Sequence, residues 1–377
     1  MANDKDFLLK NAVEVGGPTK VTLGTVTSND IDLATGNYFT DTLAANTTYT
    51  LSNAGDVQSF QLEVTGGVAT YNIANANYDS VSFSVSGQDT GARDIVFNSN
   101  GSKVYYLGAT NGAIYQYSLS TAFDLSTASY DSVSFSVSSQ DTLPTGLAFS
   151  NDGTKMFMVG RSTDTIYQYS LSTGFDLSTA SYDSVSASIA TEDYSPEDIT
   201  FNNDGTKLYM LGTGNSEAVN QYSLSTAFDL STLSFDSVSL SVGGFKKGVT
   251  FNADGSKLFI TGSSTDAVEQ YNLSTPFVVS SGVSSGISFS FASQDGNANA
   301  TVFNNDGTKM YMLGDDNNTI YQYSTSSGAT LTWPSSIEWA GGVAPSAPAT
   351  GETDVFTLST DDGGTSYVGV KTADNLS

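Results

Sequence analysis

The chain contains no cysteine and no histidine, and only 13 of its 377 residues are basic. These absences exclude disulfides, thiolate or imidazole metal sites, Cys–His and Ser–His–Asp nucleophiles, and an imidazole pH switch. With 39 acidic residues the formal net charge is −26, which argues against nucleic acid or an anionic membrane as the main partner. Any chemistry must therefore use carboxylates, hydroxyls or lysines.

Long apolar runs are also missing. The first ten residues carry several charges and lack the apolar stretch of a secretory signal. No other segment approaches the ~18 apolar residues that a membrane span requires. We therefore expect no membrane insertion, synthesis in a cytoplasm, and use there or in a particle assembled there.

An internal repeat dominates the middle of the chain. The segment Phe149–Lys155 recurs in similar form four more times, and its glycines are spaced by 52, 52, 50 and 52 residues. A Gln-Tyr pair follows with a similar period. Its tyrosines are Tyr117, Tyr169, Tyr222, Tyr271 and Tyr323. The chain therefore carries five copies of one structural unit.

Each copy reads as four short strands. In the second copy, Asp152-Gly153 lies between two apolar runs and predicts a hairpin turn, because glycine accepts the positive φ that such turns need. Met156–Val159 is apolar at successive positions, which predicts a strand buried on both faces. About 50 residues per four-stranded unit is typical of a propeller blade. The pattern predicts an all-β fold with a five-bladed β-propeller and almost no helix.

The two ends of the array indicate how the ring closes. Tyr71–Tyr78 aligns with Phe123–Tyr130, so the array begins with the outer strand of a blade whose inner strands are missing. The last copy ends at Tyr323 without an outer strand. We expect residues 78–85 to complete the blade formed by residues 303–323, which would hide the sheet edges; an open solenoid is the alternative.

The flanks of the array contain further short β-like runs that are too small to form a core separately. We expect residues 21–66 and 329–377 to form one small antiparallel, jelly-roll-like β-sandwich, with the propeller, residues 67–328, inserted at a turn. This arrangement would place residues 60–64 beside residues 331–333. Residues 1–20 are then an N-terminal attachment arm.

Segments outside the propeller resemble virion proteins. Residues 5–17 are similar to the opening of tail-fibre and appendage proteins of marine bacteriophages, and residues 31–39, 332–342 and 362–367 are similar to a small β-sandwich module of such proteins. The resemblance covers about 110 residues and implies a phage structural component. It implies location in the virion, binding to other virion proteins through the arm and sandwich, and a homo-oligomer, with a trimer favoured.

The blades separately resemble lactonase-type and surface-layer propellers that contain Phe-Ser-Pro-Asp-Gly-Thr-Lys repeats. This sequence has Asn203 and Ala253 where proline is usual. The resemblance therefore implies the architecture alone, and we expect no activity to carry over.

Positions that vary between copies are candidates for ligand contact. Five different side chains stand four residues before each inner-strand phenylalanine: Arg93, Thr145, Glu197, Lys247 and Asn299. At one mouth of a propeller channel they would suit a polar ligand such as a sugar; the alternative is that they are exposed and unconstrained.

A second set of positions is acidic. Eight residues before the same phenylalanine lie Asp89, Asp141, Asp193 and Asp295. Carboxylates from neighbouring loops could hold Ca²⁺, although an aspartate there more often caps a turn. We therefore expect no cofactor, with Ca²⁺ as the alternative.

Together these patterns predict a non-enzymatic phage virion protein, a tail fibre or appendage that displays the propeller for contact with a host-surface glycan. A capsid decoration protein is the first alternative. The second is a polysaccharide-degrading hydrolase, in which Glu197, Asp198 and Asp94 would supply the acid and the base or nucleophile.

Overall fold

The computed structural model describes residues 21–43, 47–215 and 217–374. The described residues divide into two compact units, one between residues 70 and 327 and one formed by those before residue 70 and after residue 327. The predicted arm, residues 1–20, lies outside the described residues. The predicted boundaries lie at residues 66/67 and 328/329. Each unit is described by itself below.

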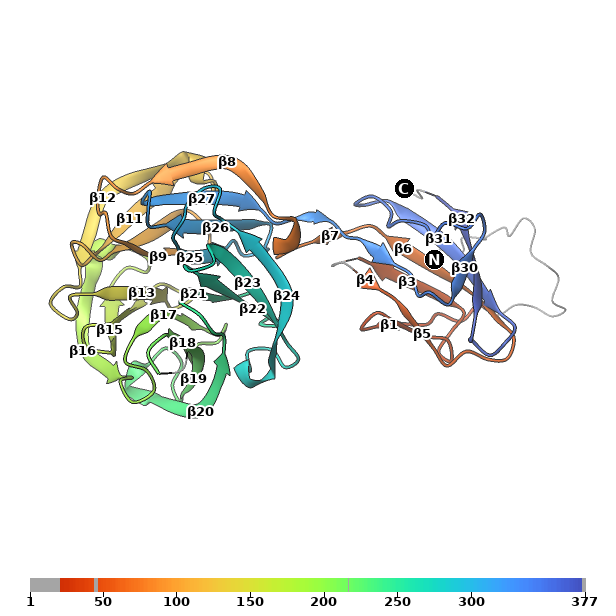
Figure 1. Ribbon diagram of the computed structural model, residues 1–377, viewed down its shortest axis with the longest axis horizontal. Helices are drawn as coiled ribbons and strands as arrows, with labels where there is room; N and C mark the ends of the chain where they lie inside the picture. Colours follow the sequence, from red (N-terminus) through yellow and green to blue (C-terminus); the bar gives the residue numbers. More distant parts are fainter. Residues whose placement is uncertain (1–20, 44–46, 216, 375–377) are drawn as a thin grey trace, which may run out of the picture. The chain divides into compact units, whose positions relative to one another are not determined.

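The unit of residues 70–327 consists of four-stranded sheets arranged around a ring (Figure 1). Among the described residues there are five such sheets, here called blades 1 to 5. Their strands run from the channel outward as follows: blade 1, β9 (Ala92–Phe97), β10 (Lys103–Gly108), β11 (Ala113–Leu119) and β12 (Ala128–Ser136); blade 2, β13 (Pro144–Phe149), β14 (Lys155–Gly160), β15 (Thr165–Leu171) and β16 (Ala180–Ser188); blade 3, β17 (Pro196–Phe201), β18 (Lys207–Gly212), β19 (Ala218–Leu224) and β20 (Leu233–Ser241); blade 4, β21 (Lys246–Phe251), β22 (Lys257–Gly262), β23 (Ala267–Leu273) and β24 (Gly282–Ser290); blade 5, β25 (Ala298–Phe303), β26 (Lys309–Gly314), β27 (Thr319–Ser324) and β8 (Asn77–Ser84).

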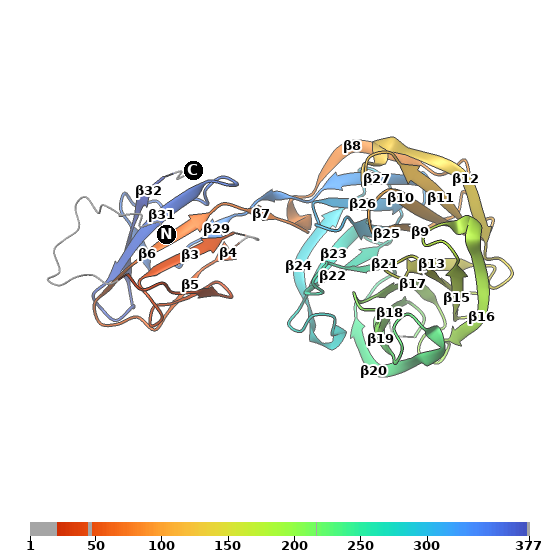
Figure 2. The same cartoon turned by 180° about the vertical axis from the view of Figure 1, so that it is seen from behind.

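The first strand of this unit closes the ring. β8 precedes blade 1 in the sequence but pairs with β27 of blade 5, with Tyr78 opposite Tyr323 and Ser84 opposite Thr319. Figure 2 shows the two strands side by side. The predicted exchange of this strand is therefore confirmed. It supplies the outer strand that the last copy of the repeat lacks.

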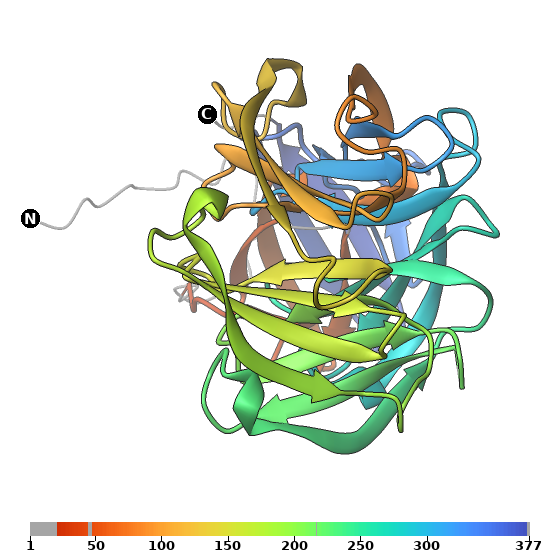
Figure 3. The same ribbon diagram turned by 90° about the vertical axis from the view of Figure 1, so that its left-hand side faces the viewer.

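Strands buried on both faces join neighbouring blades. Along β14, Met156 and Met158 pack against residues of blade 1, whereas Phe157 and Val159 pack against residues of blade 3. Side chains alternate between the two faces of a strand, so one apolar run contributes to two cores. Figure 3 shows these sheets layered one upon the next, from yellow to green.

Asp-Gly turns form the hairpin between the two inner strands of blades 2 to 5, and Asn100-Gly101 takes their place in blade 1. Gly153 has a φ of +70°, and a Cβ atom there would lie 2.3 Å from the ring of Phe175. The Asp152 carboxylate accepts the backbone N–H of Thr154 at 3.0 Å. Only glycine combines this backbone conformation with this close ring contact, so these repeated residues are structural.

Short 3₁₀ turns precede the outer strands, and the described residues contain no α-helix. The turns are η1 (Ile73–Asn75), η2 (Leu125–Thr127), η3 (Leu177–Thr179), η4 (Leu230–Thr232) and η5 (Val279–Ser281). In the part of the chain that the structure describes, no helix is long and apolar enough to cross a membrane.

The other unit combines strands from both ends of the chain. Its sheets have the orders β1-β2-β5, β29-β4 and β3-β6-β31-β32-β30, and β7 pairs with β28 where the chain passes between the units. The strands are β1 (Val26–Thr27), β2 (Asp30–Asp32), β3 (Tyr38–Thr42), β4 (Thr47–Thr48), β5 (Thr50–Ser52), β6 (Gln58–Thr65), β7 (Val68–Ala69), β28 (Ser327–Gly328), β29 (Leu331–Thr332), β30 (Ile337–Trp339), β31 (Thr353–Thr360) and β32 (Tyr367–Ala373). Phe39, Phe60, Trp333 and Phe356 lie in one buried core.

Two details of this unit differ from the prediction. β6 pairs with β31 and β3, whereas β29 pairs with β4, so residues 60–64 and 331–333 are not paired neighbours. The pairs β2–β5, β3–β6, β29–β4 and β30–β32 are parallel, so the unit is not purely antiparallel. Parallel partners need long connections rather than tight hairpins, and turn residues in the sequence do not reveal such connections.

Candidate functional site in the propeller channel

A β-bulge interrupts every inner strand at the position that varies between copies. In blade 3, Pro196 pairs with Gly212 and Asp198 with Leu211, which leaves Glu197 without an opposite residue. The same shift in the other blades leaves Arg93, Thr145, Lys247 and Asn299 unpaired in the ladder. A bulge re-aims the side chain of its extra residue and is common beside active sites. The residues that vary between copies are therefore the extra residues of the bulges, and their side chains do not follow the regular alternation of the sheet.

Charged side chains gather around one end of the channel. Arg93 and Arg161 are the only arginines of the chain. Arg161 forms an ion pair with Glu197, Lys247 Nζ lies 2.9 Å from the same carboxylate, and Arg93 lies 4.0 Å from Asp315. We call these five residues the charged mouth.

The charged groups of the charged mouth form ion pairs with one another, but one buried hydrogen-bond donor among them has no partner. Glu197 is 4% exposed and also accepts the hydroxyl of Thr213 at 2.8 Å, whereas the buried Nε of Arg161 has no hydrogen-bond partner. Burial, together with the nearby positive charges of Arg161 and Arg93, lowers the pKa of Lys247 to about 8. The sequence-based prediction named Arg93, Glu197 and Lys247 for this mouth. It did not place Arg161 and Asp315 there, which lie in the loops after β14 and β26.

The two remaining predicted residues connect neighbouring blades. The Thr145 hydroxyl donates to the carbonyl of Pro196 at 3.0 Å, and Asn299 Nδ2 donates to the carbonyl of Ala92 at 2.6 Å. Both side chains are buried. Their amide and hydroxyl groups are thus used in joining blades.

Two aspartates from blades on either side of blade 2 meet inside the channel. Asp94 of blade 1 and Asp198 of blade 3 are hydrogen-bonded to each other and are 4% and 6% exposed. Asp94 also accepts the N–H of Leu147 at 2.8 Å, and Asp198 accepts the N–H of Val249 at 2.7 Å, so each carboxyl group reaches the next blade. Gly146 allows this approach, because a Cβ atom there would lie 2.7 Å from Cα of Asp198.

The two carboxyl groups resist ionisation because they are buried side by side. Burial raises the pKa of Asp94 to about 7. Burial and then the charge of Asp94 raise the pKa of Asp198 well above its usual value. Two adjacent carboxylates in an apolar surrounding cannot both ionise easily. Asp198 therefore carries the proton that the pair shares, and Asp94 is the first of the two to ionise.

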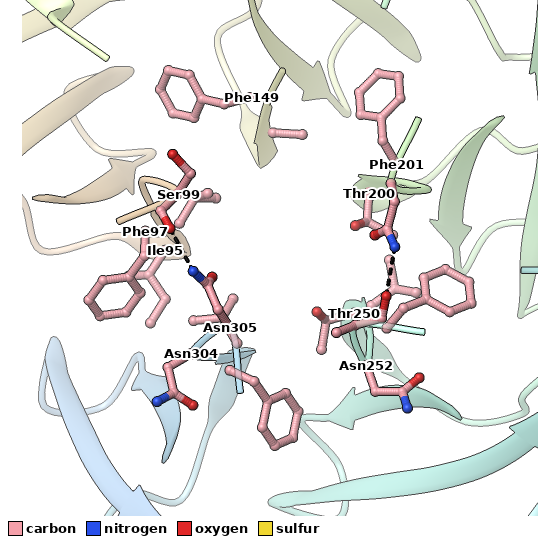
Figure 4. Close-up of a pocket in the computed structure, with 18 of the residues that line it drawn as sticks. Ile95, Phe97, Ser99, Phe149, Thr200, Phe201, Thr250, Asn252, Asn304 and Asn305 are labelled. Carbon is pink, nitrogen blue, oxygen red and sulfur yellow. Dashed lines mark hydrogen bonds between the residues drawn. The ribbon is translucent and has the colours of Figure 1, made fainter. Parts of the chain in front are cut away.

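The carboxyl pair lines a cavity of about 450 Å³. Inner-strand side chains and the turns that follow them form its wall, and Figure 4 shows Phe97 and Phe201 on opposite sides of it. Asparagine amides connect the turns of neighbouring blades around the opening: Asn151 donates to Asn203, Asn203 to Ala253, and Asn305 to Ser99, each to a backbone carbonyl at 2.6 Å. We call this end of the channel the asparagine mouth.

Tyr71 connects the turns of blades 4 and 5, where the turn of blade 4 has alanine in place of asparagine. Its hydroxyl accepts the N–H of Ala253 at 3.2 Å and donates to the carbonyl of Asn305 at 3.1 Å. The corresponding residues of blades 1 to 4 are phenylalanines without a hydroxyl. Sequence reasoning treated these turns as structural only and did not predict the cavity, although Asn151, Asn203 and Asn305 share one position of the repeat.

The four aspartates considered for Ca²⁺ hold separate loops. Asp141 accepts the N–H groups of Leu143 at 2.7 Å and Thr163 at 3.0 Å and the hydroxyl of Thr163 at 2.7 Å. Asp89, Asp193 and Asp295 accept backbone N–H groups in the same way within their own blades. Among the described residues no group of three or more acidic side chains could hold a metal ion. Their contacts match the turn-capping alternative, and binding of Ca²⁺ stays a prediction.

The shared proton predicts an unusual pH dependence of stability. The pKa values of Asp94 and Asp198 are raised in the folded chain, so the folded state binds protons that the unfolded state has released above about pH 4. Stability should therefore fall as the pH rises from about 4 to beyond 7. Asp198→Asn should flatten this pH dependence, because it removes one of the two raised pKa values, measured as denaturant midpoints from pH 4 to 8. An unchanged slope in the variant would show that the pair does not hold the proton.

One family model matches part of the chain. It is described as a seven-bladed β-propeller lactonase and matches residues 64–244, slightly less than half of the chain. Asp94, Asp198, Arg93, Arg161 and Glu197 lie within the matched segment. The described residues contain five four-stranded sheets where the family description has seven blades. No curated protein matches the sequence significantly.

Several solved propellers are similar at low identity. A candidate 6-phosphogluconolactonase from Bacteroides fragilis is 12% identical, with a TM-score of 0.38, over 53% of this chain and 55% of that chain. A candidate 6-phosphogluconolactonase from Bacteroides uniformis is 15% identical, with a TM-score of 0.39, over 61% of this chain and 69% of that chain. The periplasmic gluconolactonase of Pseudomonas aeruginosa is 15% identical, with a TM-score of 0.36, over 52% and 53%. The chain thus spans little more than half the length of the first of these.

The family match corrects the functional prediction. A non-enzymatic phage tail fibre or appendage is not supported, and neither is the expectation that no activity accompanies the lactonase-type repeats, because the matching model is that of a lactonase. The expected virion location, partners, trimer and absence of cofactors stay predictions. What the comparisons support is an all-β, propeller-type chain with a lactonase-like segment.

Proposed function

We propose that the propeller unit is a hydrolase that opens a small polar lactone in its central channel, with Asp94 and Asp198 as the acid–base pair. The observation that carries the proposal is the proton-sharing pair at the wall of the 450 Å³ cavity. The lactonase family match, which includes both aspartates, supports the reaction class.

The two carboxyl groups can perform both proton transfers of ester hydrolysis. Ionised Asp94 takes a proton from water as the water oxygen attacks the lactone carbonyl carbon, and Asp198 gives its proton to the carbonyl oxygen. In the second step Asp198 recovers that proton, Asp94 protonates the ring oxygen, and the carbon–oxygen bond of the ring breaks. The product is a hydroxy acid, and the pair returns to its starting state.

The surroundings of the pair support a small polar substrate. Backbone N–H groups from Leu147 and Val249 fix the two carboxyl groups from neighbouring blades, which provides the preorganisation that acid–base catalysis requires. Asn98, Asn252 and Asn304 line the cavity together with Thr200 and Thr250, and these groups can exchange hydrogen bonds with sugar hydroxyls.

The charged mouth is proposed to orient the substrate at the other end of the same channel. Arg93, Arg161 and Lys247 place three cationic groups beside two carboxylates there. Glucono-δ-lactone and its 6-phosphate should therefore be assayed side by side, since a preference for the phosphate would assign an anion-binding role to these cations.

A direct assay tests the proposal. Proton release from glucono-δ-lactone at pH 6.5 should exceed the spontaneous rate with the full chain. The rate should return to the spontaneous rate with the Asp94→Asn/Asp198→Asn double variant. Equal rates for the chain and the double variant, with either lactone, would refute the proposal. Circular dichroism of both proteins would confirm that the variant is folded.

We also infer that the propeller has five blades. The inference is supported by five copies of the repeat, by five four-stranded sheets among the described residues, and by the β8–β27 pairing that leaves no sheet incomplete.

A further inference from the structure

Hydrogen bonds close the asparagine mouth at four of its five seams, where a seam is the boundary between the inner-strand turns of two neighbouring blades. The amides of Asn151, Asn203 and Asn305 join blade 2 to blade 3, blade 3 to blade 4 and blade 5 to blade 1. The Tyr71 hydroxyl joins blade 4 to blade 5. Figure 4 shows the Asn305 amide directed at Ser99. The remaining seam lies between blades 1 and 2.

This fifth seam lacks both of the groups that close the others. Ser99 stands where the turns of blades 2, 3 and 5 have asparagine, so no amide extends from blade 1. Phe175 of blade 2 stands where blade 5 has Tyr71, and it has no hydroxyl. Within the described ranges no hydrogen bond joins the turn of blade 1 to the turn of blade 2. We call this boundary the open seam.

One backbone carbonyl at the mouth has no donor as a result. Four equivalent carbonyls each accept an asparagine amide or the Tyr71 hydroxyl, and they belong to Ser99, Asn203, Ala253 and Asn305. The carbonyl of Asn151 accepts no such group in the part of the chain that the structure describes. Asn151 and Ser99 both line the cavity of about 450 Å³. A ligand in this cavity can therefore bind the carbonyl of Asn151 by donating an O–H or N–H group.

The open seam lies between the same two blades that Asp94 joins. Its carboxyl group reaches from blade 1 to blade 2, where it accepts the N–H of Leu147. Three residues of extended strand separate Asp94 from Phe97, which is about 10 Å, and Ser99 lies two residues further along the chain. This distance exceeds the length of one pyranose ring. A ligand that contacts both Asp94 and the open seam must therefore be larger than a single sugar.

The walls of the cavity suit an uncharged sugar ring. No lysine or arginine of the described residues lines the cavity. Phe97 and Phe149 provide aromatic rings beside the open seam, and Asn98 and Asn252 provide amides. Apolar rings with a few placed polar groups are typical of sites that bind polar small molecules, because the rings contact C–H groups while the polar groups fix the hydroxyls.

We propose that the substrate is a lactone that carries a second sugar ring, with the lactone at the Asp94–Asp198 pair and a hydroxyl of the second ring donating to the carbonyl of Asn151 at the open seam. The position of the lactone rests on the proposed function, whereas the open seam does not. The four closed seams show that this position accommodates an amide or a hydroxyl, because the chain itself supplies one there.

Two lactones measure the contribution of the second ring. Lactobiono-δ-lactone is glucono-δ-lactone with a galactosyl group attached. With the full chain its kcat/KM should be about tenfold higher than that of glucono-δ-lactone, mainly through a lower KM. Ser99→Asn copies the turns of blades 2, 3 and 5 and supplies the missing amide. It should reduce this preference about fivefold and raise the midpoint of thermal unfolding by roughly 2 °C.

Asn100→Asp is the matched control. It gives the turn of blade 1 the Asp-Gly pair of the other blades, but it adds no amide, and Asn100 does not line the cavity. The preference for lactobiono-δ-lactone should persist in this variant. Equal kcat/KM of the wild type for the two lactones, or a full preference in Ser99→Asn, would overturn the proposal.

Binding without turnover separates this inference from the proposed hydrolysis. Lactose and glucose contain the corresponding sugar rings but no lactone. Saturation-transfer NMR with the full chain should detect lactose at millimolar concentration, and Ser99→Asn should weaken its binding about fivefold. This result without hydrolysis of either lactone would refute the hydrolase and support the subsite. Hydrolysis of glucono-δ-lactone without binding of lactose would refute the subsite alone.

Discussion

Replacing Asp198 by asparagine is expected to lower kcat/KM for lactone hydrolysis by about 10²–10⁴-fold, which is the usual contribution of a positioned acid or base. Asparagine is isosteric with a protonated aspartate and can still donate a hydrogen bond to Asp94. It cannot give up a proton to the carbonyl oxygen, so the variant tests proton transfer rather than packing. Asp94→Asn should cause a loss of similar size, because it removes the group that accepts the proton of water.

The pH dependence should distinguish the two aspartates. The pKa of Asp94 is about 7, so activity of the wild type should rise as the pH approaches 7 and fall again when Asp198 ionises at higher pH. The residual activity of Asp198→Asn should still increase as the pH approaches 7 but should not decrease at higher pH. The residual activity of Asp94→Asn should not show the increase near pH 7. Initial rates between pH 5 and 8.5, corrected for spontaneous opening of the lactone, measure the increasing and decreasing parts of the pH–activity profile.

Asp131→Asn is the matched control for both variants. It makes the same chemical change, but Asp131 pairs with Lys103 on the outer part of blade 1 and does not line the cavity. We expect its kcat/KM to stay within about twofold of the wild type, since surface charges away from the reacting atoms contribute little. A loss as large as that of Asp198→Asn would mean that the carboxyl pair acts only through stability.

Asp79→Ala is expected to reduce the free energy of unfolding by about 2 kcal/mol, because charged hydrogen bonds at partly buried sites contribute at this level. Asp79 lies on β8 and accepts hydrogen bonds from Lys309, Ser324 and Gln322 of blade 5. Its removal leaves a half-buried ammonium group without a counter-ion. It also weakens the strand that closes the ring, so backbone amides of β8 should exchange with solvent faster in hydrogen-exchange measurements.

Asp131→Ala separates the loss of the ion pair from the opening of the ring. Asp131 makes the same contacts with Lys103, Ser118 and Gln116, but its strand follows its partner strand directly in the chain. The two variants should lose similar stability, while fast exchange of β8 should occur only in Asp79→Ala. Fast exchange of β8 in both variants, or in neither, would contradict a closing role for this strand.

Acid should weaken these same ion pairs. Desolvation opposes ionisation of Asp79, but hydrogen bonds from Lys309, Ser324 and Gln322 outweigh it and lower its pKa. A lowered pKa stabilises the fold above about pH 4, and this contribution is lost as the pH falls through the value in the folded state. This is opposite in sign to the effect of the Asp94–Asp198 pair, so the two contributions separate when midpoints are compared below pH 4 and above it.

The repeat made the strands and turns of each blade predictable. Gly153 and its counterparts, the consecutive apolar residues of β14, and the alignment of Tyr78 with Tyr130 are local features that short-range conformational preferences determine. The position of β8 followed from the same alignment, and its pairing with β27 confirms it. Parallel pairing in the other unit was not predictable, because β3 and β6 belong to no repeat and no hairpin turn connects them.

The candidate site was only partly predictable. The variable positions Arg93, Glu197 and Lys247 stood out against a constant repeat, and the structure places a bulge at each of them. Arg161 and Asp315 share a second variable position, the residue directly after the second strand of each blade, and the comparison of copies did not consider it. The lactonase match also overturned a function that resemblance outside the propeller had suggested.

The sequence by itself determined the all-β class, the four-stranded unit and its period, because hydrogen bonds and side-chain alternation within one copy depend on residues close together in the chain. Only the tertiary structure decided that Asp94 and Asp198 meet at the wall of a cavity and that Tyr71 connects the turns of blades 4 and 5. These facts depend on distances across the ring between residues of different copies. Closure of the ring sets those distances, and no periodicity along the chain encodes them.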